Sequence, residues 1–385
     1  MSNRVSGAIT VPADFFGLTS GSTAWPTAGP APTFPFGRLS TYGAQQTYWG
    51  TLHTANNTIN WTALDTLVTA AKAAGVQKGI YGLYRCPTFL ATTGADVAGP
   101  WGYLGECAHP SDLAQLTYFC TQFAERNISE YDSFFDAVQL FNEPYLSAST
   151  TPSNTLYEWS TPAQFIDKLW TAYAALKAAD SSLLILSPGM THYGNITSPL
   201  AGLGYLSTIN GSTHSTKTGE DCYEGVATHW YGLAPEGPAF TGYCTISGWR
   251  GTEVEALRAY QKAITDGLAV NGPVHVTEFA VSANLTGAEL DLFLNESTAY
   301  RESWIQCFYI DAMLAGVKSV SPWIFGSSGL WDDYLLTDDP GVISGLRKIY
   351  NACAGKTIVA PSGITADGGR FLTFSDGSTY TVAAP

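Results

Sequence analysis

Eight short apolar runs, separated by segments with helical periodicity, constrain the fold of this chain more than any other feature. The runs are hydrophobic at nearly consecutive positions, which is typical of strands buried on both faces of a parallel sheet. They extend over residues 15–18, 36–39, 79–84, 137–141, 183–186, 225–230, 274–277 and 320–325. Because parallel strands need a crossover between them, this alternation predicts an α/β chain folded as a (β/α)8 TIM barrel.

The segments between the runs carry helix start and stop signals. Asn60 is a predicted cap, and Gly75 is predicted to end the same helix at the position where a positive φ is favourable only for glycine. Ser111 is predicted to open a second helix, and the sequence at 161–164 is a capping box with proline at the first helical position. Further helices are expected at residues 252–268, 289–314 and 342–354.

The end of the chain has a different character from the rest. After Gly355, β-branched and polar residues alternate around an Asp376-Gly377 turn, which is a hairpin signal. Together with the first residues of the chain, this segment is expected to form a small β-appendage. The predicted organisation is therefore a barrel over 12–354, with 1–11 and 355–385 packed on it.

Composition limits the classes of partner. The formal charge is −14 with only 18 Lys and Arg, which argues against nucleic acid, and no apolar run is long enough to cross a bilayer. Charged residues are only 13% of the chain while aromatic residues are plentiful, which suits neutral polar ligands such as sugars. We expect a monomer without a membrane partner or a cofactor.

The start of the chain and its cysteines bear on the location of the protein and on its disulfides. The opening ten residues lack the features of a secretory signal, so an extracellular location is favoured only if a signal was removed. Seven cysteines leave disulfides open, with Cys86–Cys107 and Cys222–Cys244 as the first pairs to test.

Polar residues follow or end several of the apolar runs. In a barrel, the carboxyl ends of the strands surround one pit, and active sites are built there. The candidate site residues are Arg38, Asn142, Glu143, His229, Tyr231, Glu278 and Trp323. The histidines show no paired spacing with carboxylates, so no metal is implied.

Two of these residues are glutamates on the fourth and seventh predicted strands. Strands four and seven lie across the barrel mouth from each other, so Glu143 and Glu278 are expected to face each other although about 135 residues separate them. Two carboxylates across a cleft indicate glycoside hydrolysis. Glu278, kept ionised by Arg38 and Tyr231, is the predicted nucleophile, and Glu143, with no obvious cation nearby, is the predicted acid/base.

The same motifs resemble a known family. The motifs "FGRLS", "FNEP", "THWYG", "HVTEFA" and "SPWIF", at the ends of the second, fourth, sixth, seventh and eighth predicted strands, are similar to those of the retaining glycoside hydrolases of clan A. The opening "FFGLTS" and the stretch "WTALDTLVTAAKAAGVQKGIYGLYRCPTFLA" look most like family 39 and related exopolysaccharide-cleaving enzymes, with family 5 as a neighbour. The resemblance covers residues 15 to about 350.

The resemblance implies a role for each candidate residue. Asn142 would bind the sugar 2-hydroxyl, Arg38 and Tyr231 would be partners of the nucleophile, His229 a polar wall, and Trp323 a stacking platform. The implied function is retaining cleavage of β-glycosidic bonds in a poly- or oligosaccharide, and the many loop aromatics favour endo action. Two alternatives stay open: a non-catalytic carbohydrate-binding barrel and a transglycosylase on the same fold.

Overall fold

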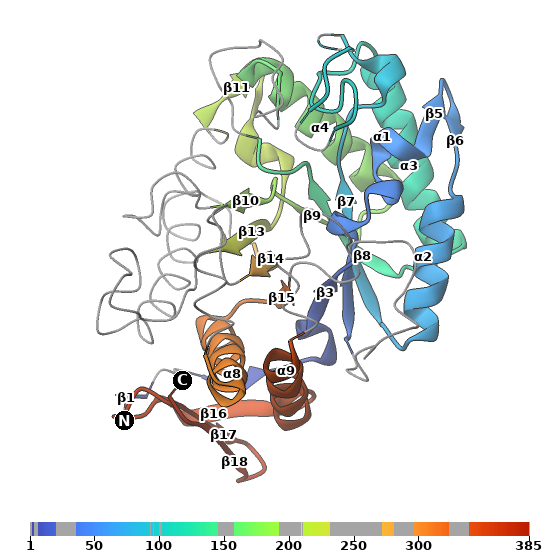
Figure 1. Ribbon diagram of the computed structural model, residues 1–385. Coiled ribbons are helices and arrows are strands. Elements are labelled where there is room, and N and C mark those ends of the chain that lie inside the picture. Colours follow the sequence, from blue (N-terminus) through green and yellow to red (C-terminus); the bar gives the residue numbers. More distant parts are fainter. Residues whose placement is uncertain are drawn as a thin grey trace.

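The computed structural model of the chain is shown in Figure 1. It describes residues 2–3, 7–20, 36–92, 94, 96–99, 102–144, 158–191, 209, 211–231, 272–280, 296–322 and 339–384. The predicted helix at 252–268, the first part of the helix predicted at 289–314, Cys244 and Trp323 lie outside these residues.

Two parallel sheets form the centre of the protein. The first has the strand order β3-β4-β7-β8-β9 and the second the order β10-β13-β14-β15. The first sheet consists of β3 (Gly17–Thr19), β4 (Arg38–Ser40), β7 (Lys78–Leu83), β8 (Phe135–Leu140) and β9 (Leu184–Leu186). The second consists of β10 (Met190–Thr191), β13 (Val226–Tyr231), β14 (Val274–Ala280) and β15 (Ser319–Pro322). Each of the eight predicted runs contains or overlaps one of these strands.

Isolated parallel bridges join the two sheets on both sides. Phe16, just before β3, is bridged to Val320 of β15, and Leu186 of β9 is bridged to Gly225, just before β13. A third bridge connects Asn142, beyond the end of β8, to Gly189, which precedes β10. The chain is therefore an α/β protein whose parallel strands follow one another in sequence order within two bridged sheets.

Helices connect the strands, and several begin and end as the sequence predicts. They are α1 (Trp49–Leu52), α2 (Thr62–Ala73), α3 (Leu113–Ser129), α4 (Pro162–Ala179), α8 (Thr298–Ala315) and α9 (Pro340–Cys353). Thr161 and Gln164 form the expected capping box of α4, and Gly75 follows α2 with φ +89°. The start of α3 differs by one residue, because Asp112 caps it by accepting from the Ala114 N–H, in place of Ser111.

Small sheets complete the structure. The hairpins β5 (His53–Ala55) with β6 (Thr58–Ile59) and β11 (Thr213–His214) with β12 (Lys217–Thr218) lie outside the central sheets. The C-terminal sheet joins β1 (Ser2–Asn3), β2 (Ile9–Thr10), β16 (Thr357–Ile364), β17 (Arg370–Phe374) and β18 (Thr379–Val382), all antiparallel. The predicted C-terminal hairpin is thus confirmed, and the sheet lies beneath α8 and α9 in Figure 1.

The C-terminal sheet is attached through α8. Ile358, Leu372 and Phe374 share one buried cluster with residues of α8 and α9. Arg370 of β17 forms a two-point ion pair with Asp311 of α8 at 2.6 and 2.7 Å, and both side chains are fully buried. This pair fixes the sheet to the helix.

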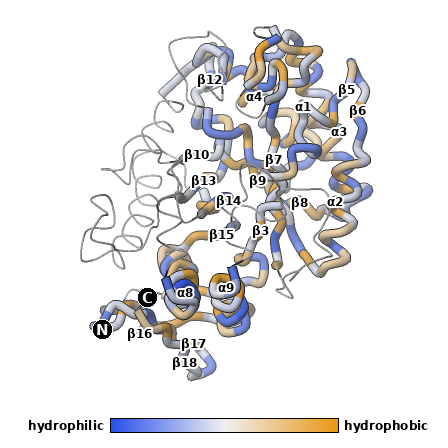
Figure 2. The backbone as a smooth tube through the Cα atoms, in the orientation of Figure 1, coloured by the Kyte–Doolittle hydropathy of each residue, from blue (hydrophilic) through white to orange (hydrophobic). Residues whose placement is uncertain are grey.

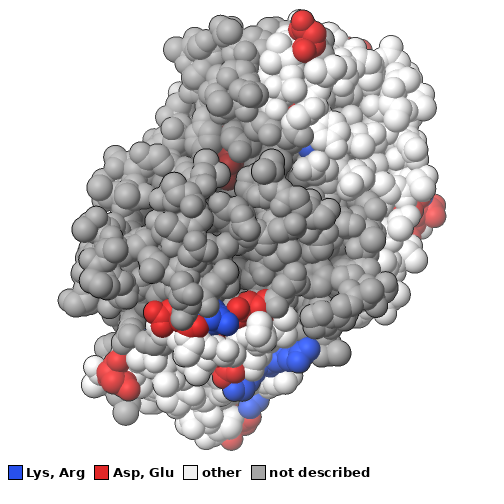
Figure 3. All heavy atoms as spheres, in the orientation of Figure 1, with Lys and Arg blue, Asp and Glu red and all other residues white. Residues whose placement is uncertain are grey.

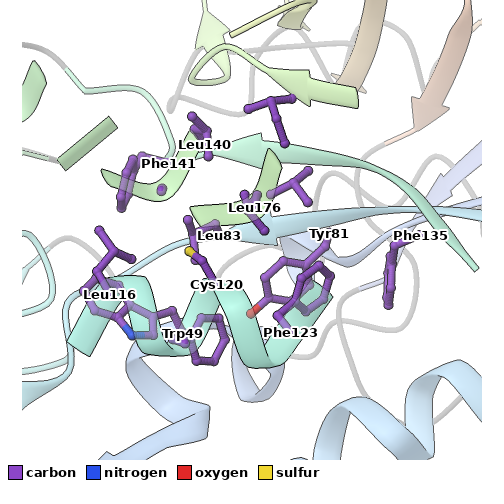
Figure 4. Close-up of a cluster of buried hydrophobic side chains, with 14 of the residues drawn as sticks. Trp49, Tyr81, Leu83, Leu116, Cys120, Phe123, Phe135, Leu140, Phe141 and Leu176 are labelled. Atoms are coloured by element: carbon purple, nitrogen blue, oxygen red, sulfur yellow. The ribbon is translucent and has the colours of Figure 1, made fainter. Parts of the chain in front are cut away.

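The main hydrophobic core lies between the strands and their helices. Tyr81 of β7 stacks on Phe123 of α3 at 4.2 Å, and Leu83, Leu140 and Phe141 extend the contact, as Figure 4 shows. Along α2 hydrophobic and hydrophilic positions alternate in Figure 2, as expected of a helix with one buried face. A separate small cluster is formed by residues of β7, β8, β9 and β13, namely Ile80, Ala137, Leu186 and Ala227, with Leu184 packed against it.

Two further expectations can be compared with the structure. Cys86 and Cys107, one of the two cysteine pairs to test, are both buried and both free, so they form no disulfide in the structure; burial raises the pKa of the Cys86 thiol to about 12. Among the described residues, no helix is both long and apolar enough to span a membrane.

Candidate active site

Glu143 is held beyond the end of β8 by an unusual backbone. Phe141 and Glu143 have φ values of +59° and +42°, which residues with a side chain seldom adopt. Hydrogen bonds to Gly189 keep this turn in place: the Glu143 N–H donates to the Gly189 carbonyl at 2.8 Å, and the Gly189 N–H donates to the Phe141 carbonyl at 3.2 Å. Such backbone strain persists where the surrounding structure enforces it, commonly at functional sites.

Glu278 is directed into the same region by a bulge in β14. Thr228 pairs with Val276, but the next residue, His229, pairs with Glu278, so Thr277 is the extra residue. A bulge changes the direction of the side chains that follow it. Here it places Glu278 opposite His229 in the adjacent strand.

His229 lies between the two glutamates. Its Nδ1 atom is 2.7 Å from Oε1 of Glu143 and 3.3 Å from Oε2 of Glu278. The ring is fully buried, while the side chains of Glu143 and Glu278 are 11% and 3% exposed. In Figure 3 acidic atoms are visible deep in a hollow, near the place that β10 occupies in Figure 1. Two carboxylates thus meet on one nitrogen.

The charge on His229 follows from these neighbours. Burial by itself lowers the pKa of His229, but the charge of Glu278 and the hydrogen bond and charge of Glu143 together outweigh it, so the pKa is raised above its ordinary value. Toward an ionised carboxylate, Nδ1 of His229 is the donor of the hydrogen bond.

The other predicted carboxyl-end residues fall into two groups. Asn142 lies beside Glu143, is 3% exposed, and its Oδ1 atom is buried without a hydrogen-bond partner among the described residues. That oxygen is available to a ligand hydroxyl. Tyr231 is the last residue of β13, but its side chain is outside the described part of the structure, as is all of Trp323.

Arg38 is not part of this site, and its predicted role is wrong. It is the first residue of β4 and is paired with Lys78, the first residue of β7, so it lies at the amino ends of the strands. Its guanidinium binds Asp14 at 2.7 Å and both carboxylate oxygens of Asp136. These two aspartates take the contacts that had been expected for Glu278.

Three residues near the carboxyl ends were missed by the sequence analysis. Arg85, which follows β7 with φ +66°, lies over the rings of Tyr48 at 4.7 Å and Tyr103 at 3.6 Å. Its Nε atom is 3.1 Å from Oε2 of Glu106, and both charged side chains are buried. The only signal in the sequence was an arginine directly after the apolar run at 79–84.

The other two missed residues are Gln139 and Gly189. Gln139 is a fully buried amide within β8, and Gly189 lies against both Gln139 and His229. A polar residue in the otherwise apolar run "AVQLF" was the signal for Gln139. For Gly189 there was no signal in the sequence other than its position after a predicted strand.

The three residues Glu143, His229 and Glu278 also have the composition of a metal site. One ligand atom from each lies within 4.8 Å of the others, the only such cluster among the residues described. However, the 2.7 Å separation of Nδ1 and Oε1 is that of a direct hydrogen bond, which the two groups satisfy without an ion. The three side chains therefore do not require a metal ion to satisfy their polar atoms at this contact.

Comparison with known proteins supports the fold. No family model matches the chain, and no curated protein does. Among solved structures, it is similar to a family 39 β-xylosidase from Caulobacter crescentus, with 17% identity, a TM-score of 0.57, and coverage of 96% of this chain and 75% of that one.

Two further structures extend the comparison. A family 39 glycoside hydrolase from Bacteroides cellulosilyticus WH2 gives a TM-score of 0.61 at 14% identity, covering 96% of this chain and 69% of that one. The catalytic domain of a family 30 xylanase C from Talaromyces cellulolyticus gives 0.54 at 15%, covering 97% and 84%. The resemblance to clan A glycoside hydrolases, most like family 39, is thus confirmed at the level of the fold.

Proposed function

We propose that this protein is a retaining glycoside hydrolase that cleaves β-glycosidic bonds of a poly- or oligosaccharide. The observation that carries the proposal is the meeting of Glu143 and Glu278 on Nδ1 of His229. Two carboxyl groups on one site, one to give a proton and one to attack, are what glycosidic cleavage requires. The fold shared with family 39 structures supports the same class.

The proposed reaction has two steps. Glu278 attacks the anomeric carbon while Glu143 gives its proton to the leaving oxygen, and a glycosyl-enzyme ester forms on Glu278. Glu143 then takes a proton from water, the water attacks the same carbon, and Glu278 leaves. Glu143 suits the acid/base role because its side chain is the more exposed of the two, and leaving group and water arrive from solvent.

The spacing of the carboxylates supports retention. Retaining enzymes hold the two groups about 5 to 5.5 Å apart, whereas inverting enzymes keep them about 6.5 to 9.5 Å apart to admit a water. One oxygen of Glu143 lies within 4.8 Å of one oxygen of Glu278. That leaves no place for a water between them.

Several finer features belong to the proposal. Asn142 binds the 2-hydroxyl of the reacting sugar through its unpaired Oδ1 atom, Tyr231 supports Glu278, and Trp323 stacks under the sugar ring. The two parallel sheets close into a (β/α)8 barrel over residues 12–354, supported by the bridges from Phe16 to Val320 and from Leu186 to Gly225. We further propose endo action by a monomer.

The decisive experiment follows the product stereochemistry. Aryl β-xyloside, aryl β-glucoside and a panel of β-linked polysaccharides are incubated with the protein, and proton NMR records the first anomer released. We expect the β anomer from an active substrate, and loss of that activity in Glu278→Gln. As a control, Glu125→Gln changes an exposed carboxylate on α3 and should retain full activity. Release of the α anomer, or an unimpaired Glu278→Gln variant, would refute this function.

The two alternatives give different results. A carbohydrate-binding barrel without turnover would bind oligosaccharides with wild-type and Glu278→Gln proteins alike and hydrolyse none. A transglycosylase would form products longer than the substrate at high oligosaccharide concentration. Endo action predicts oligosaccharides of several lengths at the start of digestion, whereas monosaccharides alone would contradict it.

A further inference from the structure

Gln139 presents a buried amide, without a hydrogen-bond partner among the described residues, beside His229. It belongs to β8, is fully buried, and neither Nε2 nor Oε1 has a hydrogen-bond partner among the described residues. A buried amide without a partner is costly, so such a group calls for an explanation. Gln139 is also four residues before Glu143, on the strand that leads to it.

Gly189 brings this amide close to His229. A Cβ atom added to Gly189 would lie 2.2 Å from Nε2 of Gln139 and 2.3 Å from Nε2 of His229. The two nitrogens are therefore no further apart than the sum of these distances, and the Gln139 amide makes no hydrogen bond to a described residue in this arrangement. Gly189 also holds the backbone of Glu143, so one glycine connects the amide, the ring and the acid/base.

We propose that Gln139 is a positioning residue for His229: its amide, which lies beside Nε2 of the ring, closes a hydrogen bond to that atom during the reaction and can serve both protonation states of the ring. The inference rests on the proposed function for its catalytic meaning, but its geometry does not depend on it. The Nδ1 atom faces Glu143 and Glu278, and the Nε2 atom faces Gln139.

The chemistry of an amide explains the choice of residue. In the neutral ring with hydrogen on Nδ1, Nε2 is an acceptor, and in the cation it is a donor. An amide meets both needs, since its NH₂ donates to the neutral ring and its carbonyl accepts from the cation after a half-turn. A carboxylate would favour only the cation, and an apolar side chain would satisfy neither state.

This arrangement matters because the charge next to His229 changes during the reaction. Glu143 is neutral before the first step and ionised after it, while Glu278 loses its charge on forming the ester. The described charged groups that face the ring are Glu143, beyond β8, and Glu278, on β14; Gln139 and Gly189 contribute no charge. The ring must stay in place through both states, and Gln139 is the group that can hold it.

The test compares Gln139→Glu with Gln139→Met in the full-length protein. The protein is labelled with ¹⁵N-histidine, and the His229 signal is identified by its absence in His229→Asn. Without any substrate, we expect the pKa of His229 to rise by about one unit or more in Gln139→Glu and to fall in Gln139→Met. Ser321→Ala, a change at another buried polar side chain inside the strands, should leave the titration unchanged.

Kinetics provide a second readout. On an aryl β-xyloside or β-glucoside, we expect kcat to fall about tenfold or more in both variants, and KM to stay within about twofold, because Gln139 does not contact substrate. The alkaline limb of the pH profile should move up in Gln139→Glu and down in Gln139→Met. A merely structural role would change stability without these opposite shifts.

The outcomes separate this inference from the proposed function. If the His229 titration moves as expected but no glycoside is hydrolysed, the inference holds and the proposed function fails. If glycosides are hydrolysed but neither variant moves the titration, or Ser321→Ala moves it equally, the inference is overturned. Thermal melts identify a variant that does not fold; should Gln139→Met fail to fold, the near-isosteric Gln139→Glu alone decides.

Discussion

Glu143 follows β8 of the first parallel sheet and Glu278 lies in β14 of the second, yet both carboxylates reach the same ring nitrogen of His229. The contacts are 2.7 and 3.3 Å long. Glu143 reaches it through a strained turn fixed by Gly189, and Glu278 reaches it through a bulge in β14. Both features direct side chains to one point, which is the geometric basis of the proposed reaction.

The proposed acid/base role of Glu143 predicts that the effect of its replacement depends on the leaving group of the substrate. We expect Glu143→Ala to lower kcat about 10²- to 10⁴-fold on natural glycosidic bonds, because a general acid contributes about that much. On an aryl glycoside that needs no proton, the first step should be nearly normal and a burst of phenolate should precede slow turnover. Stopped-flow absorbance measures the burst. A variant that loses both kinds of substrate equally would contradict the assignment.

The carboxylate and histidine cluster predicts independence from metal ions. Because Nδ1 and Oε1 already form a hydrogen bond, we expect the protein as purified to hold no stoichiometric divalent cation. Treatment with EDTA should leave kcat and the melting temperature unchanged, and elemental analysis checks the metal content. Loss of activity that zinc or manganese restores would instead assign Glu143, His229 and Glu278 as ligands.

The raised pKa of His229 predicts a pH-dependent stability. A histidine whose folded pKa is above its unfolded value of about 6.5 stabilises the fold fully below that value, and the contribution is lost as pH rises through the folded pKa. We therefore expect His229→Asn to destabilise the protein more at pH 5.5 than at pH 9. The difference should be about 1.4 kcal/mol for each tenfold by which folding strengthens proton binding to the ring. Urea unfolding at both pH values measures it.

His275 supplies the opposite control. Burial, aided by the charges of Arg38 and Lys318, lowers the pKa of His275 well below its usual range. A depressed histidine must lose its proton on folding, so the fold is disfavoured as pH falls below about 6.5. Replacing His275 with Asn should therefore cost less at pH 5.5 than at pH 9, and the same trend in both variants would contradict the assigned charges.

Much of the fold could be predicted because the strands are nearly continuous apolar runs. Burial on both faces requires such runs, and their number and order give the α/β architecture. The rule that active sites lie at the carboxyl ends of barrel strands was enough to predict that Glu143 and Glu278 lie close together. The bulge at Thr277, by contrast, has no sequence signal, so the pairing of Glu278 with His229 could not be predicted.

The error at Arg38 has a simple cause. The apolar run was assigned to 36–39, which places Arg38 near the end of its strand, whereas β4 spans Arg38–Ser40 and begins with it. A shift of two residues in a short strand moves a side chain from the carboxyl end to the amino end. Element boundaries are the least certain part of any assignment from a single sequence.

Arg38 is accordingly predicted to affect stability and not catalysis. We expect Arg38→Met to lower the free energy of unfolding by about 1 to 3 kcal/mol, less than for a fully buried pair because Asp14 and Asp136 are partly exposed. The pH profile and KM should be unchanged. Arg126→Met, which removes the more exposed pair with Asp65, is the matched control and should cost at most about 1 kcal/mol. A large loss of kcat in Arg38→Met would instead support a role for Arg38 in the active site.

The buried pair of Asp311 and Arg370 gives the last prediction. Both side chains are fully buried and meet through two hydrogen bonds, so removing one partner leaves a charge without compensation away from water. We expect Asp311→Ala to destabilise the protein by about 3 to 5 kcal/mol, measured by urea unfolding.

The position of the pair determines how that loss should appear. Asp311 is on α8, beside the second parallel sheet, and Arg370 is on the C-terminal sheet. The ion pair therefore links the stability of the C-terminal sheet to that of α8. If the sheet is an integral part of the folded unit, Asp311→Ala should unfold in one transition at lower urea. Asp376→Asn, on the exposed turn of the same sheet, should leave the transition unchanged. Separate early unfolding of the C-terminal sheet in Asp311→Ala, with the activity intact, would instead show that the parallel sheets and their helices do not need it.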